Sequence, residues 1–208
     1  MGTARFDDED SVTSKRIAAA LGGSAGNEAT VRGLLADPSP KVRAAAIMAL
    51  VNAGFSRPDD VRRALSDPDP TVRRATCELA TRLTGADFTP LLDDADPTVV
   101  EAAAFAVGEA GDSRACGRLA EIARSHSDPL CRESAVAALG AIGDDAGRAA
   151  VLAALGDLPA VRRRAVVALA AFTGDDVEAA LRERLSDRDW QVRQAAETVL
   201  GINGSETR

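Results

Sequence analysis

The chain has 208 residues and a formal net charge of −7. This acidic balance argues against general binding to nucleic acid or to anionic lipid, because both need a positive protein surface. Hydrophobic residues make up 46% of the chain, yet aromatic residues make up only 3%, with one Trp and no Tyr. A core of this composition has to be built by close packing of small side chains between helices.

The remaining composition narrows the class of protein further. Arg greatly outnumbers Lys and Asp outnumbers Glu, a balance similar to that of proteins from salt-loving archaea or GC-rich genomes. Neither a targeting segment nor an apolar run long enough to span a membrane is found, so we expect a cytoplasmic protein without membrane contact. Cys77, Cys116 and Cys131 lack metal-ligand or disulfide spacing and are expected to be buried. No cofactor or metal is expected.

In chain order, the sequence begins and ends with polar segments, residues 1–10 and 203–208, that we expect to be disordered. A helix over residues 13–21 is expected to cap the first repeat. A recurring phrase then starts at six positions, which are Asp37, Asp67, Asp94, His126, Gly156 and Asp187.

Each phrase contains an apolar anchor, at Val42, Val72, Val99, Cys131, Val161 and Val192. The near-constant period of about 30 residues is typical of a solenoid of stacked repeats. We therefore predict an all-α fold, a right-handed α-solenoid of six helical hairpins, in a single domain over residues 11–202. The predicted hairpins span residues 27–54, 57–85, 86–111, 112–143, 144–174 and 175–202.

The phrase also indicates where each second helix begins and ends. An aspartate three residues before the anchor is expected to cap the helix, at Asp69, Asp96, Asp128 and Asp189. A proline two residues before the anchor then occupies the first helical position, where no N–H is needed. Glycines are expected to end the helices, at Gly54, Gly85, Gly111, Gly143 and Gly174. Apolar residues recur with helical period, as at Val161, Ala165, Ala168, Leu169 and Phe172, and predict the core face.

The phrase, D-P-x-V-R-x-x-A-x-x-A-L, resembles the short HEAT-like repeats named after the phycobilisome (bilin) lyases, and it covers nearly the whole chain. The resemblance implies that second helices line a concave face. It also implies a structural role for the arginine after each anchor, paired with loop aspartates. The arginines are Arg43, Arg73, Arg132, Arg162 and Arg193, and the aspartates are Asp37, Asp67, Asp94 and Asp187. Val100 replaces this arginine in repeat three, while His126 and Gly156 replace the aspartate, so we expect looser stacking there.

Positions two, six and nine after the anchor are expected to point away from the core, toward the concave face. Apolar residues that could anchor a partner there are Met48, Phe105 and Val167, although completion of the packing between repeats is an equally good interpretation. Charged residues that could orient a partner are Arg74, Glu78, Glu101, Glu133 and Arg163. Both signs of charge beside small residues favour a protein or peptide partner over nucleic acid.

Few residues suggest catalysis. His126 is the lone histidine and lies at a repeat boundary, where a surface or capping role is favoured over acid–base chemistry. Asp93, Asp94 and Asp96 lack the spacing of a calcium loop and are interpreted as caps. Arg162, Arg163 and Arg164 are adjacent in a helix, so they point in different directions and cannot form one patch.

Three functions remain open on the sequence. The first is a non-catalytic scaffold, monomeric or weakly oligomeric, that binds a protein or peptide. The second, implied by the resemblance, is a subunit or chaperone like the bilin lyases, for which Cys77 and Cys131 would be the residues of interest. The third is a nucleic-acid-binding protein that uses rows of arginine. A gel shift at low salt would separate the third function from the first.

Overall fold

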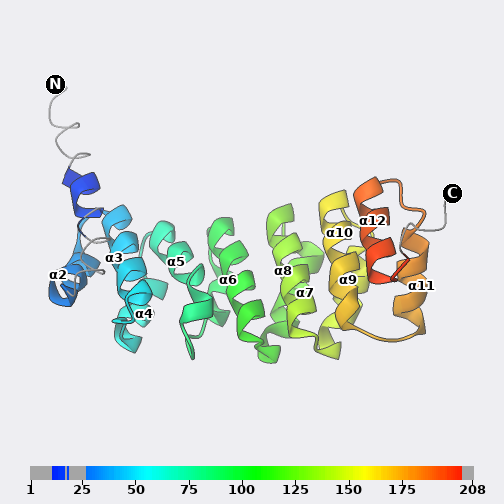
Figure 1. The fold of residues 1–208 in the computed structure, drawn as a ribbon, viewed down its shortest axis with the longest axis horizontal. Coiled ribbons are helices and arrows are strands. Elements are labelled where there is room, and N and C mark those ends of the chain that lie inside the picture. The colour runs from blue at the N-terminus through cyan, green and yellow to red at the C-terminus, as the bar shows by residue number, and fades with distance from the viewer. Residues whose placement is uncertain (1–10, 17, 19–26, 203–208) are drawn as a thin grey trace, which may run out of the picture. The chain divides into compact units, whose positions relative to one another are not determined.

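The computed structural model describes residues 11–16, 18 and 27–202. Every regular element in this described part is an α-helix or a short 3-10 helix (Figure 1). The contacts divide the chain into two compact units that meet between Leu91 and Leu92, and each unit is built from packed helical hairpins. The predicted all-α repeat fold is confirmed. The right-handed superhelix and the single domain over residues 11–202 stay predictions.

The first unit contains two hairpins in its described residues. Helices α2 (Glu28–Gly33) and α3 (Pro40–Asn52) form one, and α4 (Pro58–Leu65) and α5 (Pro70–Cys77) form the other. The two second helices, α3 and α5, pack on one another. Two short 3-10 helices follow α2 and α5, at Leu34–Ala36 and Ala80–Arg82. Residues 11–16 are helical, so the described helix starts two residues before the predicted capping helix over 13–21. Residues 17 and 19–21 of that predicted helix lie outside the described part, as do the predicted disordered ends.

The second unit repeats the arrangement along a longer row of helices. The second helices α6, α8, α10 and α12 pack in sequence on one another, and the first helix α7 packs on α9. Only a 3-10 helix, Thr89–Asp93, precedes α6, so repeat three has no α-helix in first position. The helices of this unit are α6 (Pro97–Ala110), α7 (Cys116–Ser125), α8 (Pro129–Ile142), α9 (Asp145–Ala154), α10 (Pro159–Ala168), α11 (Asp175–Arg184) and α12 (Trp190–Val199), and its short 3-10 helices are Ser113–Ala115 and Leu169–Ala171.

The predicted helix starts are confirmed. The Asp96 carboxylate accepts a hydrogen bond from the backbone N–H of Thr98 at 2.9 Å, and Pro97 occupies the first position of α6. The same cap is made by Asp69, Asp128 and Asp189 at the starts of α5, α8 and α12. These bonds satisfy backbone donors that have no partner inside the helix, so they fix the residue at which each second helix begins.

The predicted helix ends are only partly right. Gly54, Gly111 and Gly143 adopt positive φ angles within two residues of the ends of α3, α6 and α8. Gly174 is different, because its φ of 137° belongs to the residue that precedes α11, and helix α10 has already ended at Ala168. Gly85 has a positive φ, but it lies in a turn well after the end of α5.

The core is centred on the six anchor residues, each of which is at most 1% exposed. Small residues let neighbouring second helices approach closely on either side of them. A Cβ atom added to Gly108 in α6 would lie 2.9 Å from the Cα of Ala138 in α8, and one added to Gly140 would lie 2.7 Å from the Cα of Ala168 in α10. The helices can be this close only because these two positions lack a side chain.

We expect Gly140→Ala to destabilise the second unit by about 1–3 kcal/mol, because the new methyl group would force two packed helices apart. Gly117→Ala, in α7, provides the control: nothing lies within 4 Å of the added Cβ. That change should stabilise the protein by about 0.5–1 kcal/mol through the higher helix propensity of alanine. Urea unfolding followed by circular dichroism measures both. Equal stability of the two variants would contradict the close approach.

Candidate functional site

The arginine after the anchor ties one repeat to the next. In the second unit, Arg162 donates from Nε and Nη2 to the Asp187 carboxylate at 3.0 and 2.7 Å, and from Nη1 to the backbone carbonyl of Asp157 at 2.8 Å. The side chains of Arg162 and Asp187 are both 5% exposed. This bidentate pairing holds a second helix and the following loop in one fixed geometry.

The same bridge occurs at other repeats. Arg43 makes two bonds to the Asp67 carboxylate in the first unit, and Arg132 makes two to Asp157 in the second. Arg73 and Arg193 donate to the backbone carbonyls of Asp67 and Asp187, within their own repeats. Arg43, Arg132 and Arg162 thus make the kind of contact with loop aspartates that the resemblance implies.

The loop aspartates have a second role, inside their own turns. Asp67 accepts from the backbone N–H of Asp69 at 2.9 Å, and three others accept in the same way from the residue two positions on, namely Asp37, Asp94 and Asp187. Arg162, through its hydrogen bond, lowers the pKa of Asp187 below its usual value, and Arg132 does the same to the pKa of Asp157. These carboxylates are thus held in the charged form that both roles require.

The looser stacking predicted for repeat five is not supported by the contacts. By its spacing from the anchor, Gly156 aligns with the loop aspartate, whereas Asp157, one residue later, accepts the two bonds from Arg132. At repeat four, His126 makes the turn hydrogen bond that the loop aspartates make elsewhere. Its Nδ1 accepts from the backbone N–H of Asp128 at 3.1 Å. Val100, which replaces the arginine of repeat three, is buried.

The surface of interest in each unit is its second-helix face, which we define as the exposed side chains of α3 and α5 in the first unit and of α6, α8, α10 and α12 in the second. In the first unit, Met48 is 39% exposed on α3. Arg74 on α5 lies 3.6 Å from Glu78, and both side chains are exposed. In the second unit, Phe105 on α6 and Val167 on α10 are each 49% exposed. Five of the six positions six after the anchor are exposed as expected, and Ala137 is half-buried, whereas Ala44, two after its anchor, is buried.

Helices α6 and α8 form a groove with a volume of about 480 Å³, which we call the acidic groove. Phe105 of α6 and Leu130 of α8, which is 55% exposed, supply its large apolar side chains. Three carboxylates line the same groove, at Glu101, Glu109 and Glu133. Among the described residues that line it, Arg164 of α10 is the one basic residue, and its Nη2 lies 3.3 Å from Glu133.

Helices α10 and α12 form a second groove, of about 460 Å³, with the opposite charge. Arg163, Arg164 and Val167 line it from α10, and Gln191 and Gln194 line it from α12. It contains no carboxylate among its described lining residues. Arg162 is buried and bonded to Asp187, so the three consecutive arginines do not form one patch, although Arg163 and Arg164 line the same groove.

The predicted site residues thus separate into three places. Glu101, Phe105 and Glu133 come together in the acidic groove, while Arg163 and Val167 lie in the second groove. Met48, Arg74 and Glu78 belong to the first unit and line neither. Sequence reasoning missed residues at positions one before, three after and ten after the anchor, namely Leu130, Arg164 and Glu109. Position nine was chosen in place of ten, but Gly108 and Gly140 at that position lie against the next helix.

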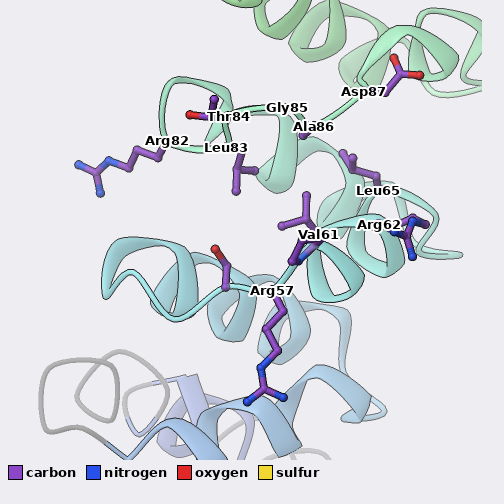
Figure 2. Close-up of a pocket in the computed structure, with 12 residues that line it drawn as sticks. Arg57, Val61, Arg62, Leu65, Arg82, Leu83, Thr84, Gly85, Ala86 and Asp87 are labelled. Atoms are coloured by element: carbon purple, nitrogen blue, oxygen red, sulfur yellow. The ribbon is translucent and has the colours of Figure 1, made fainter.

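The first unit has a pocket of about 510 Å³ between α4 and the segment that follows α5 (Figure 2). Three arginines line it, but they point in different directions in Figure 2. Arg57 is paired with Glu28, Arg62 with Asp59, and Arg82 with the Asn52 side-chain oxygen. Because the guanidinium groups do not converge, this pocket does not form an anion site.

The residues considered for chemistry have structural surroundings. All three cysteines are buried, and the Cys131 thiol donates to the Pro97 carbonyl at 3.2 Å. Burial raises the pKa of Cys131 to about 11, so its thiol is protonated at neutral pH. Asp94 and Asp96 accept backbone bonds at the start of α6, and Asp93 pairs with Arg118. No helix of the described part is long and apolar enough to cross a membrane.

Comparison with known protein families identifies the type of repeat in this chain. Residues 27–92, 85–159 and 150–208 match the family model described as HEAT repeats, and together they cover well over half of the sequence. The chain belongs to the HEAT-repeat family. The match does not distinguish the phycobilisome lyase type of HEAT-like repeat. Comparison with curated proteins gives no match.

Solved structures similar to this HEAT-repeat chain include armadillo repeats. A designed armadillo repeat protein in complex with the peptide (KR)4 has a TM-score of 0.61 and 16% identity, over 82% of this chain and 97% of that one. The Escherichia coli protein YibA has a TM-score of 0.61 and 19% identity, over 82% and 68%. Human deoxyhypusine hydroxylase in complex with glycerol is 25% identical over 94% and 81%, but its TM-score is 0.49. The first two likenesses establish the fold alone.

We expect Arg162→Ala to destabilise the second unit by about 3 kcal/mol, because it leaves the buried Asp187 carboxylate without its bidentate partner. The control is Arg182→Ala on α11, which removes an exposed pair with Glu178 and should change stability little. Urea unfolding midpoints measure the difference. Equal midpoints for the two variants would contradict the structural role of the arginine.

The stability of the second unit should also depend on pH through Asp187. Because its pKa is lower in the folded state, the pairing contributes stability above the usual aspartate pKa, and the contribution is lost as pH falls through the lowered folded value. The difference in unfolding midpoint between wild type and Asp187→Asn should therefore be largest above the usual aspartate pKa and should shrink as the pH is lowered through the folded-state pKa. A difference that stays constant over this range would contradict the pairing.

Proposed function

We propose that this HEAT-repeat chain is a non-catalytic scaffold that binds a protein segment or peptide on the second-helix face of each unit. The observation that carries the proposal is the position of two exposed apolar side chains. Phe105 and Val167 each lie in a groove between second helices, surrounded by charged or amide side chains that could orient a partner. An apolar centre with a polar rim is the usual composition of a protein interface.

The size of the two grooves also supports the proposal that they bind a peptide. Volumes of about 460 and 480 Å³ fall in the range of pockets that enclose several side chains or a small ligand. The repeat fold can hold a peptide, because the designed armadillo repeat protein is in complex with one. We propose the same use for this chain, with Met48, Arg74 and Glu78 as the corresponding contact residues of the first unit.

The burial of the thiols disfavours the lyase-like alternative for this chain's own cysteines. A cysteine that carries or transfers a chromophore has to be reached by it and has to ionise. Cys77 and Cys131 are both completely buried, and the pKa of Cys131 is raised. Incubation with bilin should therefore give a colourless protein. Monomeric or weakly oligomeric state and cytoplasmic location remain predictions from the sequence.

The distribution of charge disfavours the nucleic-acid alternative. Residues 92–208 contain 20 acidic and 13 basic residues, and residues 1–91 contain 12 of each. Several arginines of the second unit are already bonded to aspartates, including Arg132, Arg148 and Arg162. A surface of this kind releases few counterions from a phosphate backbone. A labelled duplex should give no gel shift at low salt.

The direct test uses peptides selected from a random display library on the full wild-type chain. We expect Phe105→Glu to weaken their binding at least about tenfold, because a carboxylate would replace the apolar centre of the contact. Fluorescence anisotropy with labelled copies of the selected peptides measures the dissociation constants.

The matched control is Phe55→Glu, which places the same charge at a 38% exposed phenylalanine in the loop between α3 and α4. It should leave binding unchanged. Both variants need the wild-type unfolding midpoint before their affinities are compared. If the peptides bind Phe105→Glu as tightly as wild type, the second-helix face of the second unit is not the binding surface.

A further inference from the structure

The acidic groove contains carboxylates that the fold leaves without partners. Glu101 and Glu109 lie on α6, and neither has an ion pair or a side-chain hydrogen bond with any described residue, although ion pairs join many other charged side chains of the second unit. Glu133 has a single contact, at 3.3 Å to Arg164. Three carboxylates thus face one guanidinium, which leaves a local excess of negative charge.

Large apolar side chains flank this negative charge. Phe105 stands between Glu101 and Glu109 in the sequence of α6, one helical turn from each, so all three share one side of the helix. Leu130 at the start of α8 lines the same groove. Small residues form the rest of the lining, including Gly108, Ala137 and Ala141. The groove therefore has room for a side chain, an apolar wall and uncompensated carboxylates.

We infer that the acidic groove binds an extended peptide segment in which a lysine or arginine is adjacent to a bulky apolar residue. This inference rests on the proposed function and specifies the partner for one groove. The apolar residue would contact Phe105 and Leu130, and the cation would pair with Glu101 and Glu109. An aromatic ring beside the carboxylates favours a cation further, since a guanidinium or ammonium is attracted to the ring face.

Charge complementarity excludes the opposite kinds of partner. An acidic peptide, a phosphate group or an anionic lipid would bring negative charge next to glutamates that already lack a counter-ion. A small inorganic cation would leave Phe105 and Leu130 in water, so it would not use the apolar part of the groove. The net negative charge of residues 92–208 would also attract a basic segment from a distance and increase its association rate.

The test uses three labelled synthetic peptides of equal length with the same leucine and phenylalanine residues. Their remaining positions carry arginine, glutamine or glutamate. Anisotropy titration of the full chain should give at least about tenfold tighter binding for the arginine peptide than for the glutamine peptide, and no binding of the glutamate peptide. The preference should decrease as salt is raised, because screening weakens exposed charge pairs.

The decisive variant is Glu101→Gln with Glu109→Gln, which removes two charges that have no partner in the fold. It should weaken binding of the arginine peptide about tenfold and leave binding of the glutamine peptide unchanged. The control removes two charges from first helices, by Glu121→Gln on α7 with Glu178→Gln on α11, both exposed. It should have no effect on either peptide. An equal loss in the control would mean that net charge, rather than the groove, attracts the peptide, and would overturn the inference.

Other outcomes separate this inference from the proposed function. If the glutamine peptide binds as tightly as the arginine peptide and Phe105→Glu abolishes both, the preference for a basic segment is wrong and the scaffold function stands. If no peptide binds, or if binding survives Phe105→Glu, the scaffold function and the preference for a basic segment are both wrong for this groove. If sedimentation shows a dimer that Phe105→Glu dissociates, the occupant is a second copy of the chain, and the inference is overturned.

Discussion

The bridge between an arginine of one repeat and an aspartate of the next determines where successive hairpins lie. Arg162 reaches backward to the Asp157 carbonyl and forward to the Asp187 carboxylate, so a single guanidinium fixes two loops at once. A planar group with several donors can make such bonds in only a narrow range of geometries. Because the bridge recurs at the same position of the repeat, equivalent residues of the bridged second helices face the same way. Side chains at one position of the repeat can therefore line a common binding face on those helices.

The bridge is missing where α6 meets α8, because Val100 replaces the arginine and His126 replaces the aspartate. Close contact takes its place there. Gly108 brings α6 against Ala138 of α8, and the buried Val100 adds apolar packing. The acidic groove lies over this joint. This joint supplies no structural arginine, and the arginine that does line the groove, Arg164 of α10, pairs with Glu133. Glu101 and Glu109 therefore have no ion-pair partner among the described residues.

The sequence predicts those features that depend on local backbone chemistry. The aspartate caps, the proline starts and the buried anchors follow from hydrogen-bonding needs and helical period, and all are present. The sequence-based predictions are wrong where contact with a neighbouring helix determines which residues are buried. Position nine after the anchor lies on the border of the exposed side, and the close approach of Ala138 buries Gly108, whereas position ten stays exposed at Glu109. Asp157 was missed because the loop is shifted by one residue relative to the repeat.

Exposure of Phe105 or Val167 alone would be weak evidence for binding, since folded proteins leave many apolar atoms in water. The combination in the acidic groove is more restrictive. A charged residue on a helix surface normally gains a little stability from a partner three or four residues away, and this fold uses such pairs elsewhere, as between Glu178 and Arg182. Glu101 and Glu109 have no such partner around Phe105, although arginine is abundant in the chain. Local stability does not explain that choice of residues, whereas contact with a cation from another molecule does.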